Sequence, residues 1–328
     1  MDYCLFRLRF KTALHIGGDS GMPSMAACEI SIHSDTVFSA LCHEALQMGG
    51  HEMLDRLVSY AGEGSLLMSD ALPFRDEELY LPKPAISPAI PPGGKKTWRQ
   101  DDAKALKKLK FIHASMFEEY LGFIRGENEF PVSSANASFG VKETRTMAFV
   151  RRSDKTLPFH VGVFSFFPGS GLYIVAGYNS RQAILLLASL LNSLSVSGIG
   201  GKRTAGLGRF EIERTLLLET ASSKSEAALA KLLAVSCPDY YMTLNASFPE
   251  EPELEVTVSG GFFQVVRRGG FVQSHAYADK PLKKRVMYFM AAGSCFKNRF
   301  NGGIYDVSLK GVHPVYRYAK PLFAGVKL

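Results

Sequence analysis

The sequence is poor in the features that mark secreted and membrane-spanning proteins. Its 328 residues include only five cysteines, an odd number without a C-x-x-C pair, so neither a disulfide framework nor a zinc site is expected. The longest mostly apolar stretch, Ala183–Leu191, covers nine residues, less than half of the about 20 that a membrane helix needs. Charged residues occupy the N-terminus with no apolar segment behind them, which argues against a secretory signal. These absences predict a soluble cytoplasmic protein without a membrane partner.

Motifs for binding metals and nucleotides are also missing. No H-x-x-x-H, H-D or D-x-D pattern occurs, so a divalent-metal nuclease or polymerase is not expected, and no cofactor is predicted. The glycine-rich segment Gly198–Gly208 (GIGGKRTAGLG) matches neither nucleotide motif. Arg203 stands where the dinucleotide fingerprint needs glycine and where Walker A needs Ser or Thr. In Gly93–Thr97 (GGKKT), Walker A fails because Lys96 follows Lys95.

Positive charge is unevenly distributed along the chain. Lys and Arg number 38 against 31 Asp and Glu, which gives a net charge of +7. The segment from Phe262 to Leu328 contains 12 basic residues and only Asp279 and Asp306 as acids, so it carries +10 and the rest −3. A segment with such an excess of positive charge indicates that the binding partner is a polyanion or an acidic protein. A solvated basic face that only maintains solubility is the alternative.

The first part of the chain predicts a strand followed by a helix. The strand is expected at Tyr3–Phe10, and an amphipathic run begins at Ser34 after a glycine-rich turn. We expect Ser34 and Asp35 to cap the free N–H groups of this helix, so that Asp35→Ala costs about 0.5–2 kcal/mol. Gly49-Gly50 is expected to end it.

Four more elements complete the predicted fold. The first is a strand at Ser65–Ala71. Phe159–Phe167 and Leu172–Tyr178 flank a Pro-Gly-Ser-Gly turn and predict a β-hairpin. A helix at Asn179–Leu194 and a strand at Arg209–Leu217 follow. Strand, helix, strand, hairpin, helix and strand is close to the β-α-β-β-α-β ferredoxin-like order, so the sequence predicts an α+β fold.

The predicted fold divides into two domains, at 1–218 and 219–328. The first contains an insertion at about 83–157, which opens on the Pro/Gly-rich segment Lys83–Gly94 and the basic stretch Lys95–Lys110. Because proline removes a hydrogen-bond donor and fixes φ, we expect this insertion to be an exposed excursion rather than core.

The glycine-rich loop is the strongest candidate for a binding site. Its glycines allow the backbone to approach a phosphate closely, and its cations can bind one. A merely mobile connection is the alternative. His15 and His33 could each act as a general base, although a surface or capping role is more usual and no general acid is visible.

Several segments together resemble the RAMP proteins of CRISPR systems. The glycine-rich loop after the second helix indicates only that superfamily. Three further segments narrow the resemblance to subunit four of the type III-A Csm effector complex: His33–Leu41 (HSDTVFSAL), Arg267–Val272 (RRGGFV) and Gly311–Phe323 (GVHPVYRYAKPLF). The resemblance runs over the whole length and is least clear in 83–157.

This resemblance implies two ferredoxin-like (RRM-like) units and a non-catalytic role in an antiviral ribonucleoprotein. A subunit of this kind holds the 5′ handle of the CRISPR RNA and joins the large polymerase-like subunit to the first backbone RAMP subunit. Its RNA-binding loop corresponds to Gly198, Gly200, Gly201, Lys202, Arg203, Gly206 and Gly208. In related subunits a projecting thumb kinks the duplex of guide and target RNA. Its counterpart is expected in 83–157, with backbone contacts from Lys142, Arg145, Arg151 and Arg152.

Charge and resemblance together suggest how this subunit meets its protein partners. Lys283, Lys284 and Arg285 are expected to face an acidic surface on the large or the backbone subunit. Two other functions stay open. One is a RAMP endoribonuclease that processes precursor CRISPR RNA with His33 or His15 as base, and the other is an assembly scaffold whose basic tail binds only protein.

Overall fold

A computed structural model of the protein describes residues 1–17, 25–88, 100–132, 135–150, 156–274, 277–278, 280 and 282–328. Its centre is an antiparallel sheet of seven strands, in which β5-β4-β3-β8-β1-β9 are neighbours and β2 also pairs with β8. The strands are β1 (Asp2–Phe10), β2 (Leu66–Met68), β3 (Leu72–Arg75), β4 (Glu78–Pro82), β5 (Phe111–His113), β8 (Ser170–Tyr178) and β9 (Phe210–Leu216).

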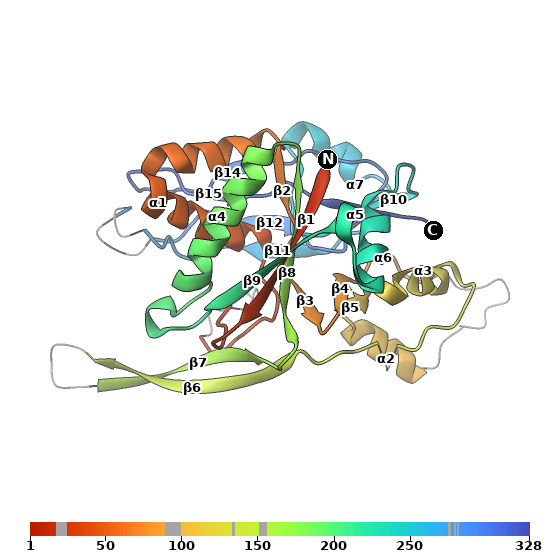
Figure 1. The fold of residues 1–328 in the computed structure, drawn as a ribbon, viewed down its shortest axis with the longest axis horizontal. Coiled ribbons are helices and arrows are strands. Elements are labelled where there is room, and N and C mark those ends of the chain that lie inside the picture. Colours follow the sequence, from red (N-terminus) through yellow and green to blue (C-terminus); the bar gives the residue numbers. More distant parts are fainter. Residues whose placement is uncertain are drawn as a thin grey trace.

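Two long helices cover one face of this sheet (Figure 1). Helices α1 (Ser34–Gly62) and α4 (Arg181–Ser197) pack on the β1 side chains of Cys4, Phe6 and Leu8. The alternate β1 residue Leu5 points into a second core on the other face, as the period of two along a strand requires. The succession β1, α1, β2–β3, β8, α4, β9 is the β-α-β-β-α-β order that the sequence predicts.

Helix α1 does not end where the glycine pair predicts. Gly49 and Gly50 leave the helical region, with φ/ψ of −144°/15° and 64°/−153°, but the helix resumes and continues to Gly62. It resumes because Leu54 and Leu57 are buried in the core shared with α4. The predicted end of the helix is therefore a kink.

The predicted hairpin between residues 159–167 and 172–178 is wrong. Strand β7 (Thr156–Phe166) pairs with β6 (Gly140–Val150), whereas β8 pairs with β1 and β3. The tight turn itself forms, since Ser170 N–H donates to the Phe167 carbonyl at 2.9 Å. The β6–β7 hairpin projects away from the body of the molecule (Figure 1).

The expectation that 83–157 is an exposed excursion is correct only in part. Ile86 is buried, and helix α3 (Phe117–Arg125) places Phe117, Tyr120 and Phe123 in the core under β3 and β8. The segment also contains helix α2 (Gln100–Lys108), and residues 89–99 lie outside the described part of the chain. Within the described part of this segment, the β6–β7 hairpin is the element that projects from the body of the molecule.

The C-terminal part consists of short elements around three small antiparallel sheets. The sheets are β13-β10-β16, β11-β12 and β14-β15. Their strands are β10 (Tyr240–Thr243), β11 (Val265–Arg268), β12 (Met287–Met290), β13 (Cys295–Phe296), β14 (Ile304–Asp306), β15 (Tyr316–Tyr318) and β16 (Phe323–Val326). The helices are α5 (Leu217–Thr220), α6 (Lys224–Leu233) and α7 (Leu254–Val258). Met242 and Val326 share one core with Leu5 and Tyr173, so the two parts of the chain pack together. Within the described ranges, none of the helices has the length and apolar character to span a bilayer.

Candidate nucleic-acid interface

Two positions in the glycine-rich loop have a conformation that fits only glycine. Gly208 has φ of +77°, and a Cβ at that position would lie 1.9 Å from the Ile199 carbonyl oxygen. Gly200 has φ of +92°, and its Cβ would lie 2.5 Å from the His15 carbonyl oxygen. Both positions therefore require glycine, because of backbone angle and close approach together.

Backbone hydrogen bonds hold the loop against the segment that follows β1. Gly201 N–H donates to the His15 carbonyl and Gly208 N–H to the Ala13 carbonyl, each at 2.9 Å. A third bond of 2.9 Å, from Ile199 N–H to the Gly208 carbonyl, closes the base of the loop. These bonds argue for an ordered loop and against the alternative of a merely mobile connection.

The loop, the end of β1 and the β6–β7 hairpin line an open cavity of about 430 Å³. It is lined by Phe10, Lys11, Thr12, Ala13, Arg145, Ser165, Phe166, Ala205, Gly206 and Leu207. The cations Lys11 and Arg145 are paired only weakly, with Glu211 at 2.8 Å and Glu143 at 3.4 Å, and all four side chains are at least 45% exposed. Such exposed pairs contribute about 0–1 kcal/mol, so both cations can exchange their partner for a phosphate.

Lys202 and Arg203 extend the positive charge beside this cavity. Lys202, with φ of +60°, places its Nζ 4.5 Å from the centre of the Phe159 ring on β7, a cation–π contact between loop and hairpin. Arg203 begins a short 3₁₀ turn, Arg203–Ala205, whose last residue lines the cavity. The loop cations predicted from the sequence are therefore partly exposed and lie beside the hairpin.

The hairpin residues predicted as RNA contacts do not all face the same way. Arg145 lies opposite Val161, which is buried with Leu207 of the loop, so Arg145 faces the cavity. Lys142 lies opposite Phe164, which packs with Tyr80 on the other side of the hairpin. Arg151 and Arg152 lie outside the described residues. The structure thus joins Arg145, and not Lys142, to the loop.

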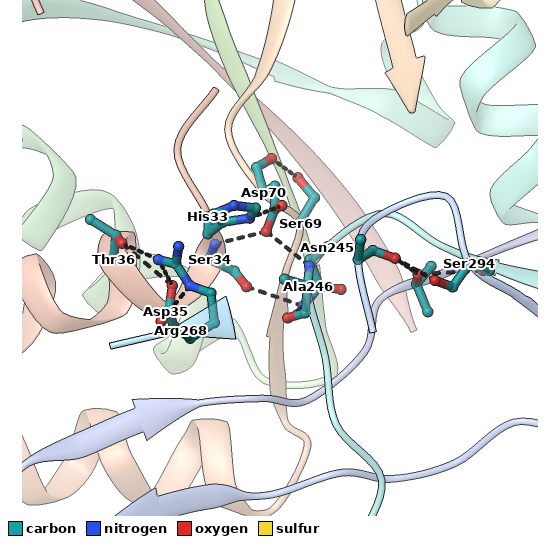
Figure 2. A network of polar contacts seen from close by, with 12 residues as sticks. His33, Ser34, Asp35, Thr36, Ser69, Asp70, Asn245, Ala246, Arg268 and Ser294 are labelled. Carbon is teal, nitrogen blue, oxygen red and sulfur yellow. Dashed lines mark hydrogen bonds and ion pairs between the residues drawn. The ribbon is translucent and has the colours of Figure 1, made fainter. Parts of the chain in front are cut away.

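The predicted N-cap of α1 has a different role (Figure 2). The N-cap residue is His33, whose side chain makes no capping bond. Instead, Asp70 accepts from Ser34 N–H at 2.8 Å and from Ala246 N–H at 3.2 Å, and its second oxygen bonds the His33 Nδ1 at 2.8 Å. A carboxylate from the β2–β3 connection therefore ties the helix start to the C-terminal part.

Asp35 forms a buried ion pair rather than a cap. Arg268 donates to both of its carboxylate oxygens, from Nη2 at 2.7 Å and from Nε at 3.2 Å, and Arg317 Nε lies 3.8 Å away (Figure 2). Burial alone raises the pKa of Asp35, but the two guanidinium groups outweigh it and hold that pKa well below its usual range. The three segments that carry the family resemblance thus meet at one carboxylate.

The two candidate histidines are both engaged in structural contacts. His33 is bonded to Asp70, and His15 is buried with its Nδ1 2.6 Å from the Gly162 carbonyl oxygen. Across the described ranges, no group of three or more His, Cys, Asp or Glu side chains is arranged to hold a metal ion.

The three cations predicted to meet a protein partner occupy different surroundings. Lys283 is exposed, with its Nζ 5.9 Å from the centre of the Phe271 ring, and Arg285 is exposed and donates to the Asp306 carbonyl. Lys284 is half-buried, and burial, followed by Arg317, lowers its pKa. Only Lys283 and Arg285 therefore present their charge outward.

Sequence reasoning missed two groups of residues that organise this region. Lys11 lines the cavity. The sequence indicated this role only by placing a positive charge at the end of a predicted strand. Asp70 and Asn245 carry no sequence signal, since their role depends on partners far along the chain. Asn245, for example, donates to Ser34 Oγ at 3.1 Å and accepts from Leu322 N–H at 2.8 Å.

Known proteins resemble this chain over its whole length. A family model for the CRISPR Csm4 C-terminal domain matches residues 237–326. A relative from Mycobacterium tuberculosis named CRISPR system Cms protein Csm4 is 37% identical over 324 residues, 98% of this chain and 97% of the relative. A Streptococcus thermophilus protein of the same name is 31% identical, with 98% of each chain covered.

Solved structures share the fold at low sequence identity. A chain of the Csm3–Csm4 subcomplex of the type III-A CRISPR-Cas interference complex matches with a TM-score of 0.65 at 17% identity, with 100% of both chains covered. A chain of the Csm1–Csm4 cassette with cA4 matches with a TM-score of 0.63 at 19% identity, over 100% of this chain and 99% of that one. At this identity the structures support the mixed α/β fold, while the sequence relatives define the family. The chain therefore belongs to the Csm4 family of type III-A CRISPR proteins.

Proposed function

We propose that this protein is a non-catalytic subunit of a type III-A effector complex that holds the 5′ handle of the CRISPR RNA in the cavity beside its glycine-rich loop. The observation that carries the proposal is the meeting of Lys11, Arg145 and the loop around one cavity. In CRISPR effectors the target sequence is recognised by base pairing with the guide RNA, so the protein needs to bind the RNA backbone. A glycine loop with weakly paired cations suits that task.

The proposal extends to protein partners and to the second half of the fold. The similar structures contain Csm1 or Csm3 beside Csm4, which supports a position between the large subunit and a backbone subunit. We assign the assembled complex to the cytoplasm. We assign the C-terminal part, 219–328, as a second ferredoxin-like unit. The β6–β7 hairpin would act as the thumb on the duplex of guide and target RNA, with Lys142, Arg151 and Arg152 as further backbone contacts.

Replacing Lys202 and Arg203 together by alanine should weaken binding of RNA that ends in the repeat-derived handle. Each lost phosphate contact should lower the slope of log affinity against log salt by about 0.7, the value for single strands. Fluorescence anisotropy of labelled handle RNA between low and moderate salt measures both quantities.

The matched control removes two exposed lysines from α6, Lys224 and Lys231, which lie on another element of the chain. This variant has the same net charge as the loop variant. If the two variants bind handle RNA with the same affinity and salt slope, the loop is not the phosphate site.

Reversing Lys283 and Arg285 to glutamate should slow assembly with the large and backbone subunits at low salt. Complementary charge mainly speeds association, so the association rate should fall and added salt should remove the difference. Stopped-flow or surface-based binding kinetics give that rate, and circular dichroism shows whether the chain stays folded. If the reversed variant associates at the wild-type rate at low salt, these cations contact solvent and not a partner protein.

The endoribonuclease alternative has one observation in its favour, the 2.8 Å contact between the His33 imidazole and the Asp70 carboxylate. We infer that this pair is structural, because Asp70 also accepts backbone N–H groups of Ser34 and Ala246. Purified protein incubated with repeat RNA in EDTA should therefore leave it intact. Cleavage that disappears in His33→Ala or His15→Ala would favour the nuclease instead.

A further inference from the structure

A second cavity lies where the end of α2, the edge of the main sheet and the segment before β6 meet (Figure 1). It measures about 110 Å³ and shares no lining residue with the cavity at the glycine-rich loop. It is lined by Ile30, Tyr80, Lys108, Lys110, Phe111, Asn136, Ala137 and Phe139. Aromatic rings, two lysines and one side-chain amide therefore surround a single small space.

Three aromatic rings form one corner of this cavity. Tyr80 and Phe111 lie on the same face of the β4–β5 pair, since the alternate residues Leu81 and Ile112 point into the core on the other face. The centre of the Phe139 ring lies 4.7 Å from that of Tyr80 and 6.5 Å from that of Phe111, at interplanar angles of 88° and 86°. Phe111 is half-buried, so it stays accessible to a flat ligand.

The polar groups of the cavity are available to a ligand. Lys110 pairs with Glu29 at 3.4 Å, but both side chains are at least 36% exposed, and exposed pairs of this kind are weak. Lys108 and Asn136 are exposed, and within the described residues neither side chain makes a hydrogen bond or an ion pair. The lysines can therefore bind a phosphate while the amide bonds the polar edge of a base.

We propose that this cavity binds one nucleotide, with its base against Phe111 and Phe139 and its phosphate between Lys108 and Lys110. A volume of about 110 Å³ suits a single base rather than a larger ligand, for which pockets of about 300–1,000 Å³ are usual. Stacking on aromatic rings accepts any base, because every base has a π-face. The nucleotide is either free in solution or an unstacked residue of an RNA strand, since both present the same base and phosphate. The inference does not rest on the handle site, because the two cavities have no residue in common.

The test uses uridine monophosphate and a single-stranded oligouridylate as probes of the full chain. Lys108→Ala/Lys110→Ala should lower the affinity for the bound probe about tenfold, the loss expected for a hydrogen bond to a charged group. Phe111→Leu keeps an apolar side chain but removes the ring, and should lower the same affinity about fivefold or more. Saturation-transfer NMR titrations measure binding of the monophosphate, and fluorescence anisotropy measures binding of the oligouridylate.

The matched control, Lys104→Ala/Lys107→Ala, has the same net charge as the cavity variant. It removes two exposed lysines of the same helix that do not line the cavity. Thermal unfolding shows whether each variant is folded, and if Phe111→Leu is not, the two lysine variants decide the question.

The outcomes distinguish the two sources of the nucleotide. Monophosphate binding that is lost in Lys108→Ala/Lys110→Ala and not in the control supports a site for a free nucleotide. The same difference with the oligouridylate alone supports a site for an RNA residue. If both lysine variants bind both probes equally, or if folded Phe111→Leu binds both as the wild type does, the inference is overturned. Lys202→Ala/Arg203→Ala should bind the monophosphate normally, so failure of this site and failure of the loop site are separate results.

Discussion

Replacing Asp35 by alanine should lower the free energy of unfolding by about 3–5 kcal/mol, the cost of breaking a buried ion pair. The variant leaves the buried Arg317 and the partly buried Arg268 without the carboxylate that both contact. Urea unfolding followed by circular dichroism measures the change. This cost exceeds the about 0.5–2 kcal/mol expected for a lost N-cap.

A true helix cap in the same chain serves as the control. The Ser223 hydroxyl accepts from Glu226 N–H at 3.1 Å at the start of α6, so Ser223→Ala should cost about 0.5–2 kcal/mol. If Asp35→Ala costs no more than Ser223→Ala, the buried pair with Arg268 is not what stabilises this junction.

The pH dependence gives an independent check on Asp35. Its pKa is lowered in the folded chain, so its charge stabilises the fold above the unfolded pKa of about 3.9. That stabilisation is lost as pH falls toward the folded pKa. The stability difference between the wild type and Asp35→Asn should therefore shrink steadily below about pH 4 and stay constant above about pH 5.

Replacing Gly208 by alanine should lower the affinity for handle RNA at least about tenfold, the loss expected when a hydrogen bond to a charged group is broken. The new Cβ would lie 1.9 Å from the Ile199 carbonyl oxygen, so the loop must move off the segment that follows β1. The cavity between the loop and Arg145 would then change shape. Anisotropy titrations with handle RNA give the affinity, and thermal unfolding gives the cost in stability.

Gly64→Ala, just after α1 and outside the cavity lining, is the matched control for this effect. Gly64 also has a positive φ, +77°, but a Cβ there would meet no atom within 4 Å. Both variants therefore carry the same backbone strain of about 1–2 kcal/mol, and only Gly208→Ala adds the clash. Equal RNA affinities for the two variants would show that the closed loop conformation does not matter for binding.

Elements with strong local patterns were predictable from the sequence. The strand at 3–10, the helix at 179–194 and the strand at 209–217 correspond to β1, α4 and β9 with small shifts at their ends. Their apolar spacing, and the Ser180 cap that accepts from Ala183 N–H, are local features. The contribution of α3 to the core was missed because the prolines and lysines before it suggested exposure of the whole segment.

Features that depend on distant partners were not predictable. A tight turn follows Phe167, but the strands on its two sides pair with other strands. Strand β7 pairs with residues 140–150 and β8 pairs with β1, and the local sequence does not reveal these partners. Asp35 has the residue type and position of a cap, yet its partners Arg268 and Arg317 lie more than 230 residues away. The glycines and cations of the loop could be proposed together as a binding site from the sequence, whereas Lys11 and Arg145 join them only through the fold.

Crosslinking of the assembled effector complex tests the RNA path most directly. Ultraviolet irradiation of the complex with its CRISPR RNA, followed by mass spectrometry of this subunit's peptides, would locate the contacts at single residues. We expect adducts in the four segments that line the cavity, at Phe10–Ala13, at Arg145, at Ser165–Phe166 and at Ala205–Leu207. A complex in which this subunit carries no RNA adducts on these segments would contradict the account and identify the protein as an assembly scaffold.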